Sequence, residues 1–248
     1  MSRTENKKKI NKKERDVISI RQERKRIINE KTDFIITEEY NALRTNILFS
    51  LTDVGCKVIG VTSSNPAEGK TTVCLNTAVS IGKTGQKVLL IDGDLRASKQ
   101  AKLLEIEGNI GLSNLLVNQV KLSEAVKKTK YENLDIIPSG SRPPNPSEML
   151  GSEAMKELMD YLKEYYDYIL IDLPPVNIVT DAMVASKYLS GLIIIVRANY
   201  TMKEDLIEVI QKINNANAKV IGVVLNANPK GYNKTGKYGN YGNYHNPK

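Results

Sequence analysis

The chain has 248 residues, 41% of them hydrophobic, and a formal net charge of +8. This size and apolar content suit one large α/β domain. No apolar run is long enough to span a bilayer and the N-terminus has no signal core, so we expect a cytoplasmic protein. Residues 1–31 carry a positive surplus of seven and residues 209–248 six unopposed lysines, which leaves residues 32–208 net negative by five. This distribution argues against nucleic acid as a partner.

The charge pattern and the segment order predict three regions. Residues 1–36 form a basic, flexible arm, with a membrane or partner contact as the alternative. Residues 37–228 form the folded domain, which opens with a helix over residues 37–53. Residues 229–248 form a flexible tail, because Gly and Asn between its tyrosines favour neither helix nor strand.

Six short apolar runs follow from residue 57 onward and predict strands that are buried on both faces. They cover residues 57–63, 87–92, 134–138, 168–173, 192–196 and 219–226. A helix beginning near Ser147 carries an apolar stripe at helical spacing. The alternation predicts an α/β fold with a doubly wound, mainly parallel sheet flanked by helices, whose ligands bind beyond the carboxyl ends of the strands. Cys56 and Cys74 lie in or beside apolar segments and are expected to be reduced thiols without a functional role.

The first predicted strand leads into "SNPAEGKTT", which matches the phosphate-loop pattern G-x-x-x-x-G-K-[ST] except that Ser64 replaces the first Gly. Gly69 lets the backbone approach the phosphates, Lys70 neutralises them, and Thr71 offers a hydroxyl to Mg²⁺. Taken by itself, the stretch is also compatible with a chance Gly-Lys-Thr at the start of a helix.

Acidic residues follow two other predicted strands. Asp92 and Asp94 end one and Asp172 ends another, and like charges so close together require a compensating cation, for which Mg²⁺ is the natural choice. Each aspartate alone is also compatible with a capping or turn role. Three acids and a phosphate loop on one sheet edge predict a nucleotide and Mg²⁺ site.

With these motifs the chain resembles the bacterial tyrosine kinases of capsular and exopolysaccharide synthesis, in the Gram-positive form that is a separate cytoplasmic protein, built on the phosphate-loop NTPase fold of ParA and MinD. The motifs that carry the resemblance are "LLIDGDLR", "GLSNLL", "PSGSRPPNPSEML", "ILIDLPPVNIVTDA", "IIIVRANYT" and "GVVLN". The resemblance implies an ATP-dependent kinase that phosphorylates its own tail at Tyr232, Tyr238, Tyr241 and Tyr244.

The same resemblance supplies the candidate site residues. The catalytic candidates are Lys70, Asp92, Asp94 and Asp172, with Asp92 as the base that accepts the phenol proton. The nucleotide-binding candidates are Glu68, Gly69, Lys70, Thr71, Thr72, Arg197 and Asn226. The Mg²⁺ candidates are Thr71, Asp94 and Asp172.

The resemblance also implies partners. These are a membrane-anchored polysaccharide co-polymerase or adaptor that recruits the kinase to the inner face of the membrane, a ring-shaped homo-oligomer with transfer between subunits, and a cognate tyrosine phosphatase. Glu38 and Arg44 match the oligomerisation helix, where Asn41 replaces an Arg. Two further departures are Ala67, where Gly is common, and "ASKQ" after Arg96, where the family has Pro and often His.

Two other functions are compatible with these motifs. A ParA/MinD-like ATPase switch would carry an additional Lys early in the phosphate loop, and "SSNPA" has none. Its membrane-binding helix would need apolar residues at helical spacing, which the Gly/Asn-rich tail lacks. A catalytically silent module that senses ATP for an adaptor conflicts with the intact Lys70 and its acidic cluster.

Overall fold

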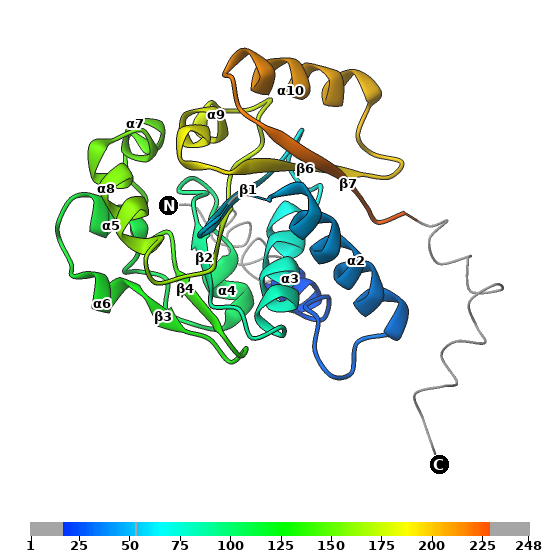
Figure 1. The fold of residues 1–248 in the computed structure, drawn as a ribbon, viewed down its shortest axis with the longest axis horizontal. Coiled ribbons are helices and arrows are strands. Elements are labelled where there is room, and N and C mark those ends of the chain that lie inside the picture. The colour runs from blue at the N-terminus through cyan, green and yellow to red at the C-terminus, as the bar shows by residue number, and fades with distance from the viewer. Residues whose placement is uncertain (1–16, 53, 229–248) are drawn as a thin grey trace, which may run out of the picture.

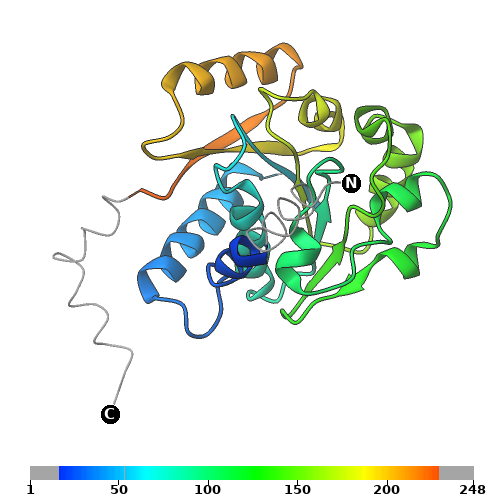
Figure 2. The same cartoon turned by 180° about the vertical axis from the view of Figure 1, so that it is seen from behind.

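The structure is a computed structural model that describes residues 17–52 and 54–228. Residues 1–16, residue 53 and residues 229–248 lie outside the described residues, and with them the first part of the predicted arm and all four tail tyrosines. A central sheet is covered by helices on both faces (Figure 1), and the reverse view shows the same layers (Figure 2).

The sheet has the strand order β3-β4-β2-β5-β1-β6-β7. Every neighbouring pair is parallel except β3 and β4, which confirms the predicted doubly wound, mainly parallel sheet. The six apolar runs all became strands, whereas the two-residue β3 consists of lysines and has no apolar signal. The strands are β1 Lys57–Ser63, β2 Val88–Asp92, β3 Lys127–Lys128, β4 Leu134–Ile137, β5 Tyr168–Asp172, β6 Gly191–Arg197 and β7 Val220–Asn226.

The helices divide into two groups because alternate strand residues point to opposite faces. On one face α2, α3 and α4 pack against the sheet, and on the other α5, α7, α8, α9 and α10 form the second core. The helices are α2 Phe34–Ser50, α3 Lys70–Gly82, α4 Gln100–Leu104, α5 Leu112–Leu116, α6 Leu122–Ala125, α7 Pro146–Leu150, α8 Glu153–Leu162, α9 Asp181–Ala185, the 3₁₀ helix η1 Ser186–Tyr188 and α10 Lys203–Asn215.

The single helix predicted to begin near Ser147 is two helices, α7 and α8. α7 ends with Gly151 as its C-cap, and a Cβ there would lie 2.8 Å from a methyl carbon of Val184, so the close approach favours glycine. Ser152 then starts α8, since its hydroxyl accepts a hydrogen bond from the backbone N–H of Met155 (3.2 Å). The predicted apolar stripe faces the core within α8.

The predicted arm does not extend to residue 36. Residues 17–24 are helical, and Ile27 and Ile28 are buried in the core that α2 and α3 share. Asn76 of α3 accepts a hydrogen bond from the backbone N–H of Ile28 (3.0 Å), which fixes this segment to the domain. The surrounding run of lysines and arginines concealed the apolar Ile27–Ile28 pair in the sequence.

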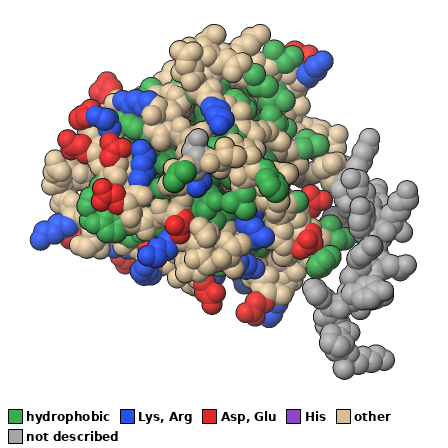
Figure 3. Space-filling model, in the orientation of Figure 1, with side chains coloured by type: hydrophobic (Ala, Val, Ile, Leu, Met, Phe, Trp, Pro, Cys, Tyr) green, Lys and Arg blue, Asp and Glu red, His purple; other side chains and the backbone are tan. Residues whose placement is uncertain are grey.

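The edge strand β7 is the exception to the predicted burial. Val223 and Leu225 are 44% and 55% exposed, and neither side chain packs into the two hydrophobic cores of the described residues. Lysines, arginines and acids are interspersed on the face seen in Figure 3. Among the described residues, no helix combines the length and the apolar character that a membrane crossing requires.

The two cysteines lead to a first prediction. Burial raises the pKa of Cys56 to about 11, and Cys74 is fully buried with a raised pKa. At pH 8 a thiol of pKa about 11 has roughly 100-fold less thiolate than an ordinary cysteine, and thiolate is the reactive form. We expect iodoacetamide to label the native protein slowly at pH 8, faster as the pH rises towards 11, and fully in urea. Cys56→Ser and Cys74→Ser assign the label by mass spectrometry, and rapid native labelling of Cys56 at pH 8 would contradict this burial.

Candidate active site

The acids converge on one sheet edge because of the strand register. Asp92 of β2 lies opposite Asp172 of β5, and Asp172 in turn lies opposite Val61 of β1, just before the phosphate loop. Asp92 and Asp172 are fully buried and Asp94 is 5% exposed. The predicted site therefore comes together at the carboxyl ends of β1, β2 and β5.

The phosphate loop joins β1 to α3 and has an unusual backbone. Ala67 and Gly69 both have positive φ, at 64° and 93°, and Gly69 is the N-cap of α3. A Cβ on Gly69 would lie 2.2 Å from the Asn226 side-chain nitrogen, so only glycine fits. The first turn of α3 begins at Lys70, and its unpaired N–H groups and positive dipole end favour an anion.

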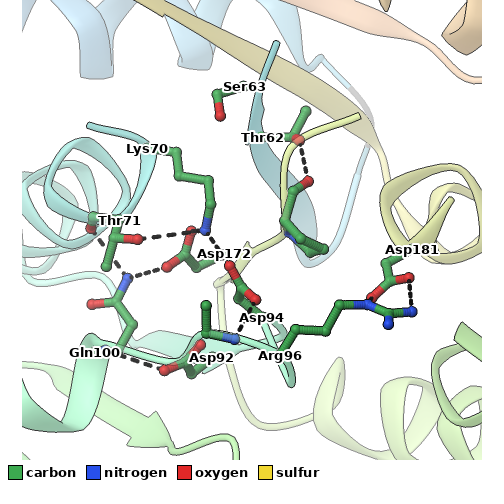
Figure 4. A network of polar contacts seen from close by, with 12 residues as sticks. Thr62, Ser63, Lys70, Thr71, Asp92, Asp94, Arg96, Gln100, Asp172 and Asp181 are labelled. Atoms are coloured by element: carbon green, nitrogen blue, oxygen red, sulfur yellow. Dashed lines mark hydrogen bonds and ion pairs between the residues drawn. The ribbon is translucent and has the colours of Figure 1, made fainter. Parts of the chain in front are cut away.

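Lys70 occupies the centre of the acidic cluster. Its Nζ donates to Asp94 Oδ2 at 2.9 Å and to Asp172 Oδ1 at 3.0 Å, and lies 3.5 Å from Thr71 Oγ1 (Figure 4). Burial lowers the pKa of Lys70, but the charges of Asp172 and Asp94 outweigh this effect and the pKa is raised. The ammonium therefore stays protonated, pairs with both carboxylates and balances one of their two negative charges.

Asp92 has one carboxylate oxygen that accepts a hydrogen bond and one buried oxygen without a partner among the described residues. Its Oδ2 accepts a hydrogen bond from the backbone N–H of Gln100 (3.1 Å), whereas its Oδ1 has no partner among the described residues. Burial, and then the charge of Asp172, raise the pKa of Asp92 to about 8. Burial also raises the pKa of Asp172, against the opposing effect of Lys70.

The predicted Mg²⁺ ligands fit a hard cation. Carboxylates of Asp94 and Asp172 and the hydroxyl of Thr71 are oxygen donors, and they already surround one cation, the Lys70 ammonium. Within residues 17–52 and 54–228 no group of three His, Cys, Asp or Glu side chains is arranged to hold a metal by itself. A Mg²⁺ site at a phosphate loop usually consists of one or two carboxylates together with substrate phosphates.

Strands β6 and β7 hold the phosphate loop from outside. Arg197 Nη1 donates to the carbonyl of Ala67 (3.1 Å), and Asn226 Nδ2 donates to the carbonyl of Glu68 (2.8 Å). The Glu68 carboxylate is buried and accepts from the Thr201 hydroxyl at 2.5 Å. Three predicted nucleotide-binding residues thus hold the loop in the structure. Thr201 was not predicted, because a threonine after a strand is not distinctive.

A further ion pair, between Arg96 and Asp181, lies beside the acidic cluster. Arg96 Nε and Nη2 donate to the two carboxylate oxygens of the fully buried Asp181 at 3.1 Å each, and the Ser147 hydroxyl donates to the same carboxylate. These contacts join the loop after β2 to α7 and α9, and Figure 4 shows the pair of Arg96 and Asp181. The residues after Arg96, where the sequence departs from the family pattern, enter the short helix α4.

The oligomerisation candidates lie away from this site, on α2. Arg44 Nη1 donates to the Ser80 carbonyl of α3 at 2.8 Å, and Glu38 Oε1 accepts from Asn41 Nδ2 at 2.8 Å. Asn41 Oδ1 in turn accepts from Arg44 at 3.2 Å. Asn41 therefore bridges Glu38 and Arg44 within one chain.

Comparison with known proteins identifies related chains. Residues 56–223 match the family model described as "AAA domain". The chain is 35% identical over 211 residues to the putative tyrosine-protein kinase CapB of Staphylococcus aureus, covering 85% of this chain and 92% of that protein. It is 40% identical to the tyrosine-protein kinase CpsD of Streptococcus pneumoniae, covering 85% and 93%.

Solved structures agree with these relatives. The crystal structure of the chimerical protein CapA2B2 has a TM-score of 0.77 and 37% identity, covering 81% of this chain and 88% of that one. The septum site-determining protein MinD from Pyrococcus horikoshii, complexed with Mg-ADP, has a TM-score of 0.60 and 29% identity, covering 71% and 72%. The fold is therefore that of the phosphate-loop NTPases, as predicted.

Proposed function

Because the chain belongs to the bacterial tyrosine-protein kinases and carries an AAA domain, we propose that it transfers the γ-phosphate of ATP to tyrosines of its own tail. The acceptors are Tyr232, Tyr238, Tyr241 and Tyr244. The observation that carries this proposal is the convergence of Lys70, Asp92, Asp94 and Asp172 beside a phosphate loop with an intact Gly-Lys-Thr.

The loop and the first turn of α3 bind the phosphates of ATP through backbone N–H groups of Gly69 to Thr72. Lys70 leaves the carboxylates of Asp94 and Asp172 and moves its ammonium to the β- and γ-phosphates. Thr71, Asp94 and Asp172 would hold Mg²⁺, which would supply positive charge to neutralise the phosphates. Most of the rate acceleration then comes from positioning and charge, since phosphoryl transfer has a loose transition state.

The acceptor phenol has an ordinary pKa near 10 and needs a base. Because the pKa of Asp92 is about 8, its basic, ionised form is a minor species at pH 7 and predominates above pH 8. Its oxygen forms a bond to the γ-phosphorus, the bond from that phosphorus to the bridging oxygen of ADP breaks, and the phenol proton passes to Asp92. Asp92 Oδ1 suits this role because it accepts no hydrogen bond from the described residues.

Tail length permits transfer within one subunit or to a neighbour. From Asn226 to Tyr244 a flexible chain spans roughly 23 Å, using about 5–6 Å times the square root of residue number. We propose transfer between subunits of a ring joined through the α2 helices with Glu38 and Arg44. Recruitment by a membrane-anchored adaptor would connect this activity to capsular or exopolysaccharide synthesis, and a cognate phosphatase would reverse it.

Mass spectrometry of the purified protein tests this function. After incubation with ATP and Mg²⁺, we expect phosphate on one or more of the four tail tyrosines, and its loss after treatment with a tyrosine phosphatase. A variant with all four tyrosines replaced by phenylalanine is the control and should bind ATP like the wild type. ATP hydrolysis without any phosphotyrosine would instead favour the MinD-like switch. ATP binding that leaves the protein unphosphorylated, even with the adaptor present, would favour the catalytically silent module.

A further inference from the structure

Gln100 is a buried amide that contacts three parts of the site. Its side chain is fully buried, and its Nε2 donates to the carbonyl of Thr71 and to Asp172 Oδ2, each at 3.1 Å (Figure 4). Its backbone N–H donates to Asp92 Oδ2 at 3.1 Å. One residue of α4 is thus bonded to the start of α3 and to the ends of β2 and β5.

The hydrogen bond from the Gln100 side chain occupies one oxygen of Asp172, so the other oxygen can contact a cation. Gln100 occupies Oδ2, whereas Oδ1 accepts from Lys70. Because the amide is uncharged, it fixes the carboxylate without neutralising it, and the negative charge stays available on the side of Lys70. The bond to the Thr71 carbonyl fixes the residue whose hydroxyl lies 3.5 Å from the same ammonium.

The other end of the amide indicates that packing alone does not explain a glutamine here. Gln100 Oε1 is buried and accepts no hydrogen bond from the described residues. A buried acceptor without a partner is costly, and a leucine of similar volume would avoid that cost. The donor end is therefore the part that the site uses. Gln100 also lies in the "ASKQ" stretch, where this chain departs from the family pattern.

We propose that Gln100 is a positioning residue that orients Asp172 and Thr71 for Mg²⁺-dependent nucleotide binding. This inference rests on the proposed function. Residues that orient metal ligands typically change metal affinity or activity by about 10–100-fold when they are replaced. Gln100 contacts no predicted phosphate-binding group other than the Thr71 backbone, so its loss acts on the Mg²⁺-dependent part of binding.

The variant Gln100→Leu tests the proposal, because it keeps the backbone N–H to Asp92 and removes both side-chain donors. A fluorescent ADP analogue is titrated against the protein in EDTA and in excess Mg²⁺. In EDTA we expect the variant to bind the ADP analogue within about twofold of wild type. In excess Mg²⁺ the wild type should bind more tightly than in EDTA, and we expect this gain in affinity to be about 10–100-fold smaller in the variant. The Mg²⁺ concentration for half-maximal phosphorylation should rise by a similar factor, with kcat changed less.

Leu103→Val is the matched control, since Leu103 is buried on the same helix and has no side-chain donor. It should keep the wild-type Mg²⁺ dependence. If Gln100→Leu does not fold, Gln100→Met makes the same comparison. Wild-type Mg²⁺ dependence in a folded Gln100 variant, or an equal loss with and without Mg²⁺, would overturn the proposal. If the wild-type protein binds the ADP analogue equally well in EDTA and in Mg²⁺, the proposed nucleotide site is overturned instead.

Discussion

Lys70→Met should abolish phosphorylation of the tail, by at least about 10³-fold, because the charge that neutralises the β- and γ-phosphates is lost. The fold should persist with a lower stability. Lys70 is the cation between the buried carboxylates of Asp94 and Asp172, and its loss leaves them uncompensated. We expect the free energy of unfolding to fall by about 3–5 kcal/mol. Incorporation of labelled phosphate from ATP and urea denaturation measure the two effects.

Lys203→Met is the control for Lys70→Met, because Lys203 is an exposed lysine at the start of α10. It should leave both phosphorylation and stability unchanged. A well-folded Lys70→Met protein that still labels its own tail would refute the assignment of Lys70 and, with it, the proposed phosphate-binding loop.

Asp92→Asn should lower kcat by about 10²–10⁴-fold while the affinity for Mg-ADP stays within about threefold, because a general base acts on the acceptor and not on the nucleotide. Asparagine keeps an oxygen for the Gln100 N–H, so the loop after β2 is retained. Above pH 8, where Asp92 is mostly ionised, the substitution also removes a buried negative charge beside Asp172. We therefore expect the melting temperature to be equal to or higher than that of wild type, which general damage to the site would not produce.

Two further variants separate the roles of the acids. Asp94→Asn should lose Mg²⁺-dependent ADP binding, because Asp94 is a proposed metal ligand. Asp160→Asn replaces an acid on the outer side of α8 and should behave like wild type. If Asp92→Asn retains more than half of the wild-type kcat, the phenol proton has another acceptor and Asp92 serves only to start α4.

Much of the fold was predictable because buried parallel strands leave near-continuous apolar runs in the sequence. Each run became a strand, and Asp92 and Asp172 met because strand ends in parallel register share one edge. The division at Gly151 was not predicted, because the apolar stripe that indicated the helix continues in α8 alone, which begins after the N-cap Ser152. Gln100 and Thr201 gave no signal for a different reason. Their partners are near in space and far in sequence, and neither residue type is characteristic of a phosphate site.

The hydrogen bond from Asn226 to the Glu68 carbonyl joins the end of β7 to the phosphate loop. Asn226 is the last residue of β7, two residues before residue 228, after which the proposed acceptor tail begins. An edge strand opens more readily than a central one, because it is paired on one side. A pull on the tail that displaces this end of β7 therefore acts on the carbonyl of Glu68, beside Gly69. If the tail is the phosphate acceptor, as proposed, a single amide hydrogen bond lies between the acceptor segment and the proposed ATP-binding loop.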